Sequence, residues 1–179
     1  TLRTGGAPRS AVGPDLNQVF VGSEGALGVI TEATLRIHPA PPAEERAAWT
    51  FPTFEAGLDT CRRILRRGAT PAVLRLYDAH ESRQTYDVDG CVLLALDEGD
   101  GAVVLATMAV AAEEARSVDG SQPTDVGLVE QWMGHRNDVS ALGHAIEADV
   151  VVDTVEVAGT WSVLPDVYAR VTEAVRAVD

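Results

Sequence analysis

The chain has 179 residues, of which 46% are hydrophobic and 23% charged, and its formal net charge is -13. This composition is typical of a globular protein with a substantial core, and the excess of carboxylates disfavours nucleic acid and anionic membranes as partners. The longest nearly apolar run, residues 102–112, is too short to span a bilayer, so we expect no integral membrane segment.

All 14 basic residues are arginines, which excludes a Schiff-base lysine and a lysine-bearing phosphate loop. Their distribution is uneven, because residues 1–90 hold 10 arginines and 11 carboxylates, whereas residues 91–179 hold 4 and 16. The cysteines, Cys61 and Cys91, lack a CxxC spacing or a nearby pair of histidines, so we predict no metal site and no disulfide framework. Isolated thiols are typical of a reducing compartment, and we predict a cytoplasmic location.

The first 40 residues differ in composition from the remainder. Six glycines within residues 5–28 indicate tight backbone turns, and residues 29–37 alternate in the manner of a β-strand. Three prolines within residues 38–42 would end that strand. We therefore predict a domain boundary here, with one domain over residues 1–40 and a second over residues 45–179.

Beyond the boundary, strand and helix patterns alternate. Thr53 is a suitable N-cap for a helix over residues 54–67, whose apolar face repeats at three- and four-residue spacing and which Gly68 would end. Other helices are expected over residues 101–118 (although 102–105 alone fit a strand), 126–135, and 162 or 166 to 177. Strands are expected over residues 47–51, 71–77, 91–96 and 149–157, with a loop over 120–124. This alternation predicts an α+β or α/β sandwich.

Residues 13–39 carry a long motif: GPDL, then GSEGALGVITEA, then a strand containing Arg36 that ends at a proline. The motif resembles the C-terminal end of the FAD-binding domain of vanillyl-alcohol-oxidase-type (PCMH-type) flavoproteins. Residues 7–10, Pro71–Asp78 and residues 153–156 with Trp161 are most similar to the branch of alkyldihydroxyacetonephosphate synthase and its bacterial relatives. The resemblance implies an α+β chain in which residues 1–40 complete the FAD-binding domain and residues 45–179 form an α/β sandwich cap, or substrate, domain.

The cofactor implied by the resemblance is FAD. Independently, Gly22, Gly25 and Gly28 recur every third residue, so backbone N–H groups can approach a ligand without obstruction by side chains. Ala26 stands where the family usually has threonine, which removes a hydroxyl group and no backbone contact. The alternative is a glycine-rich turn that binds nothing. The residues implied to lie against FAD are Ser23, Glu24, Gly25, Ala26, Leu27, Gly28, Val29 and Ile30.

Arg75 is the predicted substrate-binding residue. It falls on the strand face of Val73 and Tyr77, and the resemblance implies that it faces the substrate side of the flavin. A guanidinium group can bind the phosphate or carboxylate of a small anionic substrate through two parallel hydrogen bonds. The alternative is a surface arginine paired with Asp78 or Glu81. No catalytic residue is predicted within the chain.

The implied function is part of an FAD-dependent oxidoreductase or transferase resembling alkyldihydroxyacetonephosphate synthase, which exchanges an acyl group for an alcohol on a ketone phosphate. An FAD-linked 2-hydroxyacid dehydrogenase acting on lactate or glycolate is the enzymic alternative. A non-catalytic truncated fragment or interaction module is the alternative of another class, because the family's pyrophosphate loop and its Tyr- and His-containing segment would lie before Thr1 and after Asp179. A homodimer is left open.

Overall fold

The computed structural model describes residues 1–4, 13–140, 143, 147–148, 150–151 and 154–178, and the chain divides into two units, Thr1–Ala40 and Pro41–Asp179. In the first unit a short helix, α1 (Leu16–Phe20), begins at Asp15, whose carboxylate accepts a hydrogen bond from the Asn17 N–H at 3.0 Å. Residues 22–40 follow without a helix or a strand.

The second unit is built on a four-stranded antiparallel sheet with the order β2-β3-β1-β4. Its strands are β1 (Ala43–Phe51), β2 (Val73–Leu76), β3 (Cys91–Gly99) and β4 (Gln122–Pro123). β1 and β3 pair along their whole length, from Ala43 opposite Gly99 to Phe51 opposite Cys91. One helix joins β1 to β2 and another joins β3 to β4, so this is the ferredoxin-like split βαβ arrangement.

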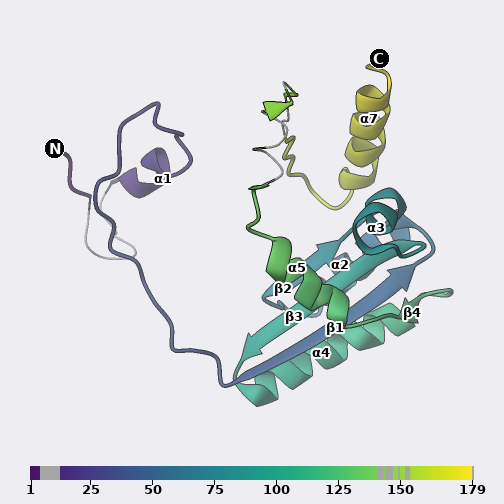
Figure 1. The fold of residues 1–179 in the computed structure, drawn as a ribbon. Helices are drawn as coiled ribbons and strands as arrows, with labels where there is room; N and C mark the ends of the chain where they lie inside the picture. The colour runs from purple at the N-terminus through teal and green to yellow at the C-terminus, as the bar shows by residue number, and fades with distance from the viewer. Residues whose placement is uncertain (5–12, 141–142, 144–146, 149, 152–153, 179) are drawn as a thin grey trace. The chain divides into compact units, whose positions relative to one another are not determined.

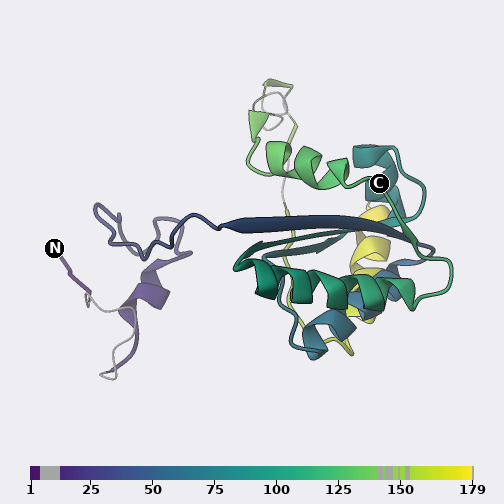
Figure 2. The ribbon, with the colours of Figure 1, turned by 90° about the horizontal axis from the view of Figure 1, so that it is seen from below.

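Helices cover both faces of this sheet (Figures 1 and 2). On one face lie α2 (Phe54–Arg66) and α4 (Gly101–Arg116), and on the other lie α3 (Ala79–Tyr86) and α5 (Gly127–His135). The alternation of side chains along β3 explains the division, because Leu93 packs with the α2 and α4 core and Leu94 with the α3 and α5 core. This layered α+β architecture confirms the predicted fold class.

The predicted helix starts are set by side-chain caps. The Thr53 hydroxyl oxygen accepts a hydrogen bond from the Ala56 N–H at 3.2 Å and begins α2, as predicted. The Asp100 carboxylate accepts hydrogen bonds from the N–H groups of Ala102 and Val103. Residues 102–105 therefore belong to α4, and the strand alternative for them is wrong. The predicted final helix is α7 (Leu164–Arg176).

Two predicted strands are wrong. Residues 29–37 form no strand, and Val29 and Ile37 are 86% and 87% exposed. A strand requires a neighbour for its backbone hydrogen bonds, and the described residues of this unit contain no other strand. The prediction for residues 149–157 lies partly outside the described residues, and residues 150–151 and 154–157 are not in a strand. Conversely, α3 was not predicted, and β4 lies in the expected loop.

Candidate functional site

The first candidate site is the glycine segment, residues 22–30, which follows α1. The Ser23 N–H donates to the Phe20 carbonyl at 3.2 Å, and the Ala26 N–H donates to the Ser23 carbonyl at 2.8 Å. These turns hold Glu24 and Gly25 at positive φ, 49° and 82°, and Gly28 lies at 153°. The segment thus turns in a left-handed conformation that most side chains resist.

The backbone of the glycine segment is open to a ligand. A Cβ atom built on Gly25 or Gly28 would have no heavy atom within 4 Å, and Val29 and Ile30 are exposed. Within the described part of the chain, the N–H groups of Gly25, Leu27 and Gly28 donate to no backbone carbonyl. Exposed N–H groups beside glycines fit the pyrophosphate, ribityl and ring oxygens of FAD, because such a cofactor requires neutral backbone donors at close range.

The second candidate site surrounds Arg75 on β2, an edge strand of the sheet. Arg75 lies opposite Leu94 of β3, and its guanidinium carbon is 5.4 Å from the ring centre of Tyr77 and 5.6 Å from that of Trp132 in α5. Both distances suit cation–π contacts. Among the described residues, no carboxylate lies within 4.0 Å of the guanidinium, so the donors of Arg75 are not used by Asp78 or Glu81.

Arg75 opens onto a shallow hollow of about 330 Å³ at the edge of the sheet. Asp78 and Glu81 also line the hollow, so its charge is mixed and only one cation is available to an anionic group. Asp78 has another task, since its carboxylate caps α3 by accepting from the Glu81 N–H at 2.8 Å. The complete lining consists of Phe54, Arg75, Leu76, Tyr77, Asp78, Glu81 and Tyr168.

Tyr168 connects α7 to this hollow. Its hydroxyl donates to the second carboxylate oxygen of Asp78 at 2.6 Å, and its ring stacks on Phe54 with centres 4.2 Å apart. Burial alone would raise the pKa of Asp78, but the hydrogen bonds from the Glu81 N–H and the Tyr168 hydroxyl lower it below the ordinary value of 3.8. Burial, together with the carboxylate of Asp78, raises the pKa of Tyr168 to about 12, so its hydroxyl remains a donor at neutral pH.

We expect Tyr168→Phe to loosen α7 without unfolding the sheet. The variant loses a hydrogen bond to a charged, partly buried acceptor but retains the ring stacked on Phe54. The free energy that holds α7 against the rest of the domain should therefore fall by about 1 kcal/mol. Hydrogen exchange of the amides of residues 164–176 should become about fivefold faster at neutral pH. Arg170→Ala, which removes only the exposed ion pair with Asp166, is the control and should change exchange little. Equal exchange rates in the wild type and Tyr168→Phe would contradict the assignment.

The same contact has a pH dependence. The folded pKa of Asp78 is lowered, so its contribution to stability is complete above the ordinary value of 3.8 and is lost as the pH falls through the folded pKa. The protection of α7 amides, measured relative to unstructured amides at the same pH, should therefore fall below pH 3.8, and Tyr168→Phe should reduce that fall.

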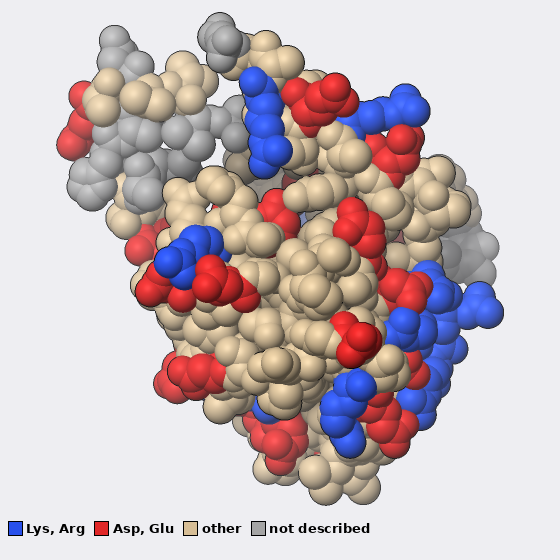
Figure 3. Space-filling model, turned by 90° about the vertical axis from the view of Figure 1, so that its right-hand side faces the viewer, with Lys and Arg blue, Asp and Glu red and all other residues tan. Residues whose placement is uncertain are grey.

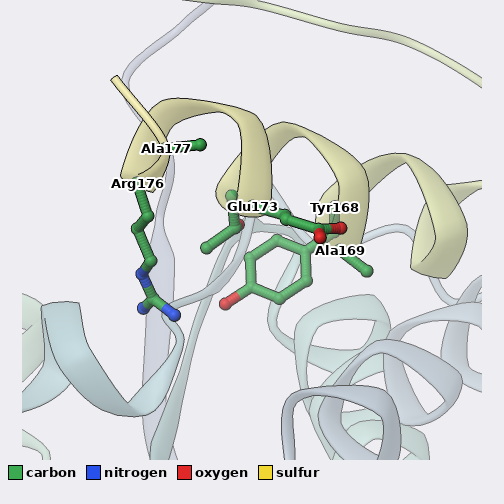
Figure 4. A pocket seen from close by; sticks show the side chains of 6 residues that line it. Tyr168, Ala169, Glu173, Arg176 and Ala177 are labelled. Carbon is green, nitrogen blue, oxygen red and sulfur yellow. The ribbon is translucent and has the colours of Figure 1, made fainter. Parts of the chain in front are cut away.

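A second hollow, of about 500 Å³, lies along α7 (Figure 4). All its lining residues come from that helix or its end, and Figure 4 shows side chains of one surface rather than groups converging from several elements. It is an open groove, and we place no site there.

The cysteines offer no nucleophile. Both are free and buried, and burial raises the pKa of Cys61 to about 12 and also raises that of Cys91. Within the described ranges, no group of three or more His, Cys, Asp or Glu residues could hold a metal ion, and no helix is long and apolar enough to cross a membrane.

Two aromatic residues of the Arg75 site were not predicted from the sequence. Trp132 lies in a helix with weak periodicity, and Tyr168 lies in the final helix, 90 residues after Asp78. No local pattern pairs residues at such separation. The sequence feature that could have pointed to these residues is the presence of a large aromatic side chain on a helix that is otherwise polar or weakly apolar.

The fold defines an α+β domain of ferredoxin-like order, and comparison with known proteins identifies its class. Residues 40–179 match the family described as FAD linked oxidases, C-terminal domain. The chain belongs to this family, which confirms the flavoprotein resemblance of the sequence. FAD is therefore the cofactor associated with its family.

The relatives are longer than this chain. The uncharacterized FAD-linked oxidoreductase YgcU of Escherichia coli O157:H7 is 32% identical over 178 residues, which are 94% of this chain and 37% of YgcU. Alkyldihydroxyacetonephosphate synthase of Caenorhabditis elegans is 42% identical over 71 residues, 40% of this chain and 12% of that protein. The probable mitochondrial D-lactate dehydrogenase of Danio rerio is 39% identical over 79 residues, 44% of this chain and 16% of that protein.

A solved structure of alkyldihydroxyacetonephosphate synthase matches with a TM-score of 0.67 over 93% of this chain and 38% of that chain. The sequence identity in this match is 21%, so it shows a shared fold.

Proposed function

We propose that this chain works within an FAD-dependent enzyme resembling alkyldihydroxyacetonephosphate synthase and acting on a small anionic, oxygenated substrate. The observation that carries the proposal is the exposed, left-handed glycine segment in the same chain as an FAD-linked oxidase C-terminal domain. The match to an FAD-linked oxidoreductase over 94% of the chain includes both parts. A cytoplasmic location belongs to this proposal and rests on the two free cysteines.

In this proposal each unit has a separate role. Residues 1–40 complete an FAD-binding domain, and residues 23–30 contact FAD through their backbone N–H groups. Residues 45–179 are the cap domain, in which Arg75 binds the phosphate or carboxylate of the substrate through its unpaired guanidinium donors. FAD, when bound, supplies the electron-accepting chemistry, and the chain supplies binding and orientation.

A 2-hydroxyacid dehydrogenase is the second candidate, favoured by the similarity to a probable D-lactate dehydrogenase over 44% of the chain. The two reactions differ in their net redox change. The test is anaerobic addition of D-lactate or glycolate to the flavoprotein that carries this chain. Persistent bleaching of the flavin spectrum would favour the dehydrogenase, whereas exchange of an acyl group for an alcohol on a ketone phosphate, without net reduction, would support the first proposal.

We expect the 179-residue chain by itself to bind FAD weakly. The glycine segment contributes neutral backbone donors, whereas tight binding of a pyrophosphate requires several further charge-assisted hydrogen bonds, each contributing about 1.5–3 kcal/mol. Flavin absorbance should be lost from the chain after extensive dialysis, but retained by the flavoprotein that carries it. A chain that stays yellow would refute this expectation. A flavoprotein that takes up no FAD would refute the enzymic proposal and favour a non-catalytic module.

A further inference from the structure

Arg75 is held in a different way from the arginines that form ion pairs. The described arginines with a carboxylate within 4.0 Å are Arg46, Arg62, Arg63, Arg67, Arg83 and Arg170. Figure 3 shows arginine and carboxylate side chains next to one another on one face of the molecule. Arg75 lies instead beside the rings of Tyr77 and Trp132. A carboxylate would cancel its charge and occupy its N–H donors, whereas an aromatic ring attracts the cation and leaves those donors free.

The ring of Tyr77 is fixed by contacts that do not involve Arg75. The Tyr77 N–H donates to the Val92 carbonyl at 2.8 Å, and its ring meets that of Tyr86 edge-on, with ring centres 5.2 Å apart. Tyr86 belongs to α3 and is buried. One side of the Arg75 site is therefore anchored to the sheet and to α3.

Trp132 reaches the site from α5. Leu128 and Val129, one turn earlier in this helix, are buried in the core between the sheet and α5, and Trp132 packs against that core. The Gln131 side-chain amide donates to the Thr85 carbonyl at 3.2 Å, which ties α5 to α3. The position of the indole is thus set by the packing of α5, independently of the guanidinium.

The Arg75 side chain, by contrast, is exposed on an edge strand. An unrestrained arginine side chain has many rotamers, and ordering it on an anion costs binding free energy. Asp78 and Glu81 line the same hollow, so a guanidinium free to move would also approach their carboxylates and lose part of its charge. Two fixed rings reduce both losses.

We propose that Trp132 is a positioning residue, whose indole holds the Arg75 guanidinium so that its free donors bind a carboxylate or phosphate group. Trp132 does not line the hollow itself, so it acts through Arg75. This inference rests on the anion-binding role that the proposed function gives to Arg75. It adds that the affinity for the anion depends on α5, a helix that contributes no residue to the lining of the hollow.

Titration of the 179-residue chain with inorganic phosphate, followed by NMR at constant ionic strength, tests this role. The Nε–H resonance of Arg75, assigned by its loss in Arg75→Lys, should shift as phosphate is added. Trp132→Leu keeps an apolar side chain against the core but removes the aromatic face, and should raise the phosphate dissociation constant about fivefold. Trp132→Phe retains an aromatic face and should remain within about twofold of the wild type.

Two controls separate this contact from general effects. Trp161→Leu makes the same substitution at a tryptophan that has no cation–π contact with an arginine among the described residues. Arg136→Ala removes the other guanidinium that lies over the Trp132 ring, at 5.5 Å. Both should leave the phosphate dissociation constant within about twofold of the wild type. Backbone amide spectra of each variant verify folding.

A double-mutant cycle tests whether Trp132 acts through Arg75. In the Arg75→Ala background, Trp132→Leu should weaken phosphate binding no further, because the group that it positions is absent. The side-chain protons of Arg75 provide a measurement without ligand. Ring currents should move their resonances upfield in the wild type and in Trp132→Phe, and less so in Trp132→Leu.

The possible failures are distinguishable. A wild-type phosphate dissociation constant in Trp132→Leu would overturn the positioning role and leave Arg75 as the anion-binding residue of the proposed function. Equal effects of Trp132→Leu and Trp161→Leu, or a further loss of binding in the Arg75→Ala background, would also overturn the positioning role alone. Absence of any phosphate-induced shift at Arg75 in the wild type would overturn the role that the proposed function gives to Arg75, and the positioning role with it.

Discussion

Gly25→Val and Gly28→Val are each expected to abolish flavin incorporation into the flavoprotein that carries this chain. Gly25 and Gly28 lie at φ of 82° and 153°, where a β-branched residue is strained by about 1–3 kcal/mol or adopts another conformation. The space around each Cβ position is empty, so the folded unit itself does not exclude the side chain. Valine would instead redirect the backbone N–H groups and occupy the side from which FAD approaches. The measurement is the ratio of flavin to protein absorbance after purification.

Gly134→Ala is the matched control. A Cβ atom at Gly134 also has no heavy atom within 4 Å, but this residue lies in α5 without a positive φ. The control should retain stoichiometric FAD. If Gly25→Val and Gly28→Val fold and retain it as well, residues 22–30 are an ordinary turn, and the assignment of this segment to the flavin fails.

The elements that the sequence predicts well carry their own local signals. α2 has an N-cap threonine, an apolar repeat along one face and a glycine after its end, and the structure places it at Phe54–Arg66. β3 begins with an uninterrupted apolar run over residues 91–96, which suits a central strand buried on both faces, as Leu93 and Leu94 show. In such segments local preference and tertiary packing agree, so sequence patterns suffice.

The sequence-based predictions fail for segments whose secondary structure depends on contacts with other segments of the fold. Residues 29–37 have the alternation of a strand, but a strand requires a neighbour for its N–H and C=O groups, and the described part of their unit contains none. α3 shows the converse: it forms although its sequence lacks an apolar face, since only Ser82 and Tyr86 are buried and its other residues, apart from Ala79, are polar. Its formation depends on the Asp78 cap and on packing against β3, neither of which gives an apolar period.

The candidate sites show the same division. The glycine segment is a contiguous motif, so its residues could be named from the sequence. The surroundings of Arg75 come from β2, α3, α5 and α7, and the contacts of Arg75 with Trp132 and of Asp78 with Tyr168 join residues more than 50 positions apart. Such contacts depend on the three-dimensional fold and leave no spacing to detect.

Arg75→Ala is expected to lower kcat/KM of the flavoprotein by roughly 30- to 5,000-fold, equivalent to about 2–5 kcal/mol of transition-state stabilisation, with flavin content unchanged. The guanidinium carbon lies 5.4 Å from the ring centre of Tyr77 and 5.6 Å from that of Trp132, and no described carboxylate lies within 4.0 Å of the guanidinium, so its donors are available to an anionic substrate. Arg75→Lys should not rescue activity, because an ammonium group is a point charge that lacks the planar pair of donors. Steady-state kinetics beside the flavin spectrum measures both effects.

Arg136→Ala provides the control for the aromatic contact. The Arg136 guanidinium carbon also lies over the Trp132 ring, at 5.5 Å, but Arg136 does not line the hollow that contains Arg75. Its removal should change kcat/KM less than threefold.

Wild-type kcat/KM in Arg75→Ala would make Arg75 a surface residue, and loss of flavin together with activity would assign it to cofactor binding or to the fold. Because Arg75 lies on an edge strand and is exposed, its replacement leaves the core between the sheet and its helices intact. A fall in kcat/KM with retained flavin therefore measures the substrate contact rather than a damaged domain.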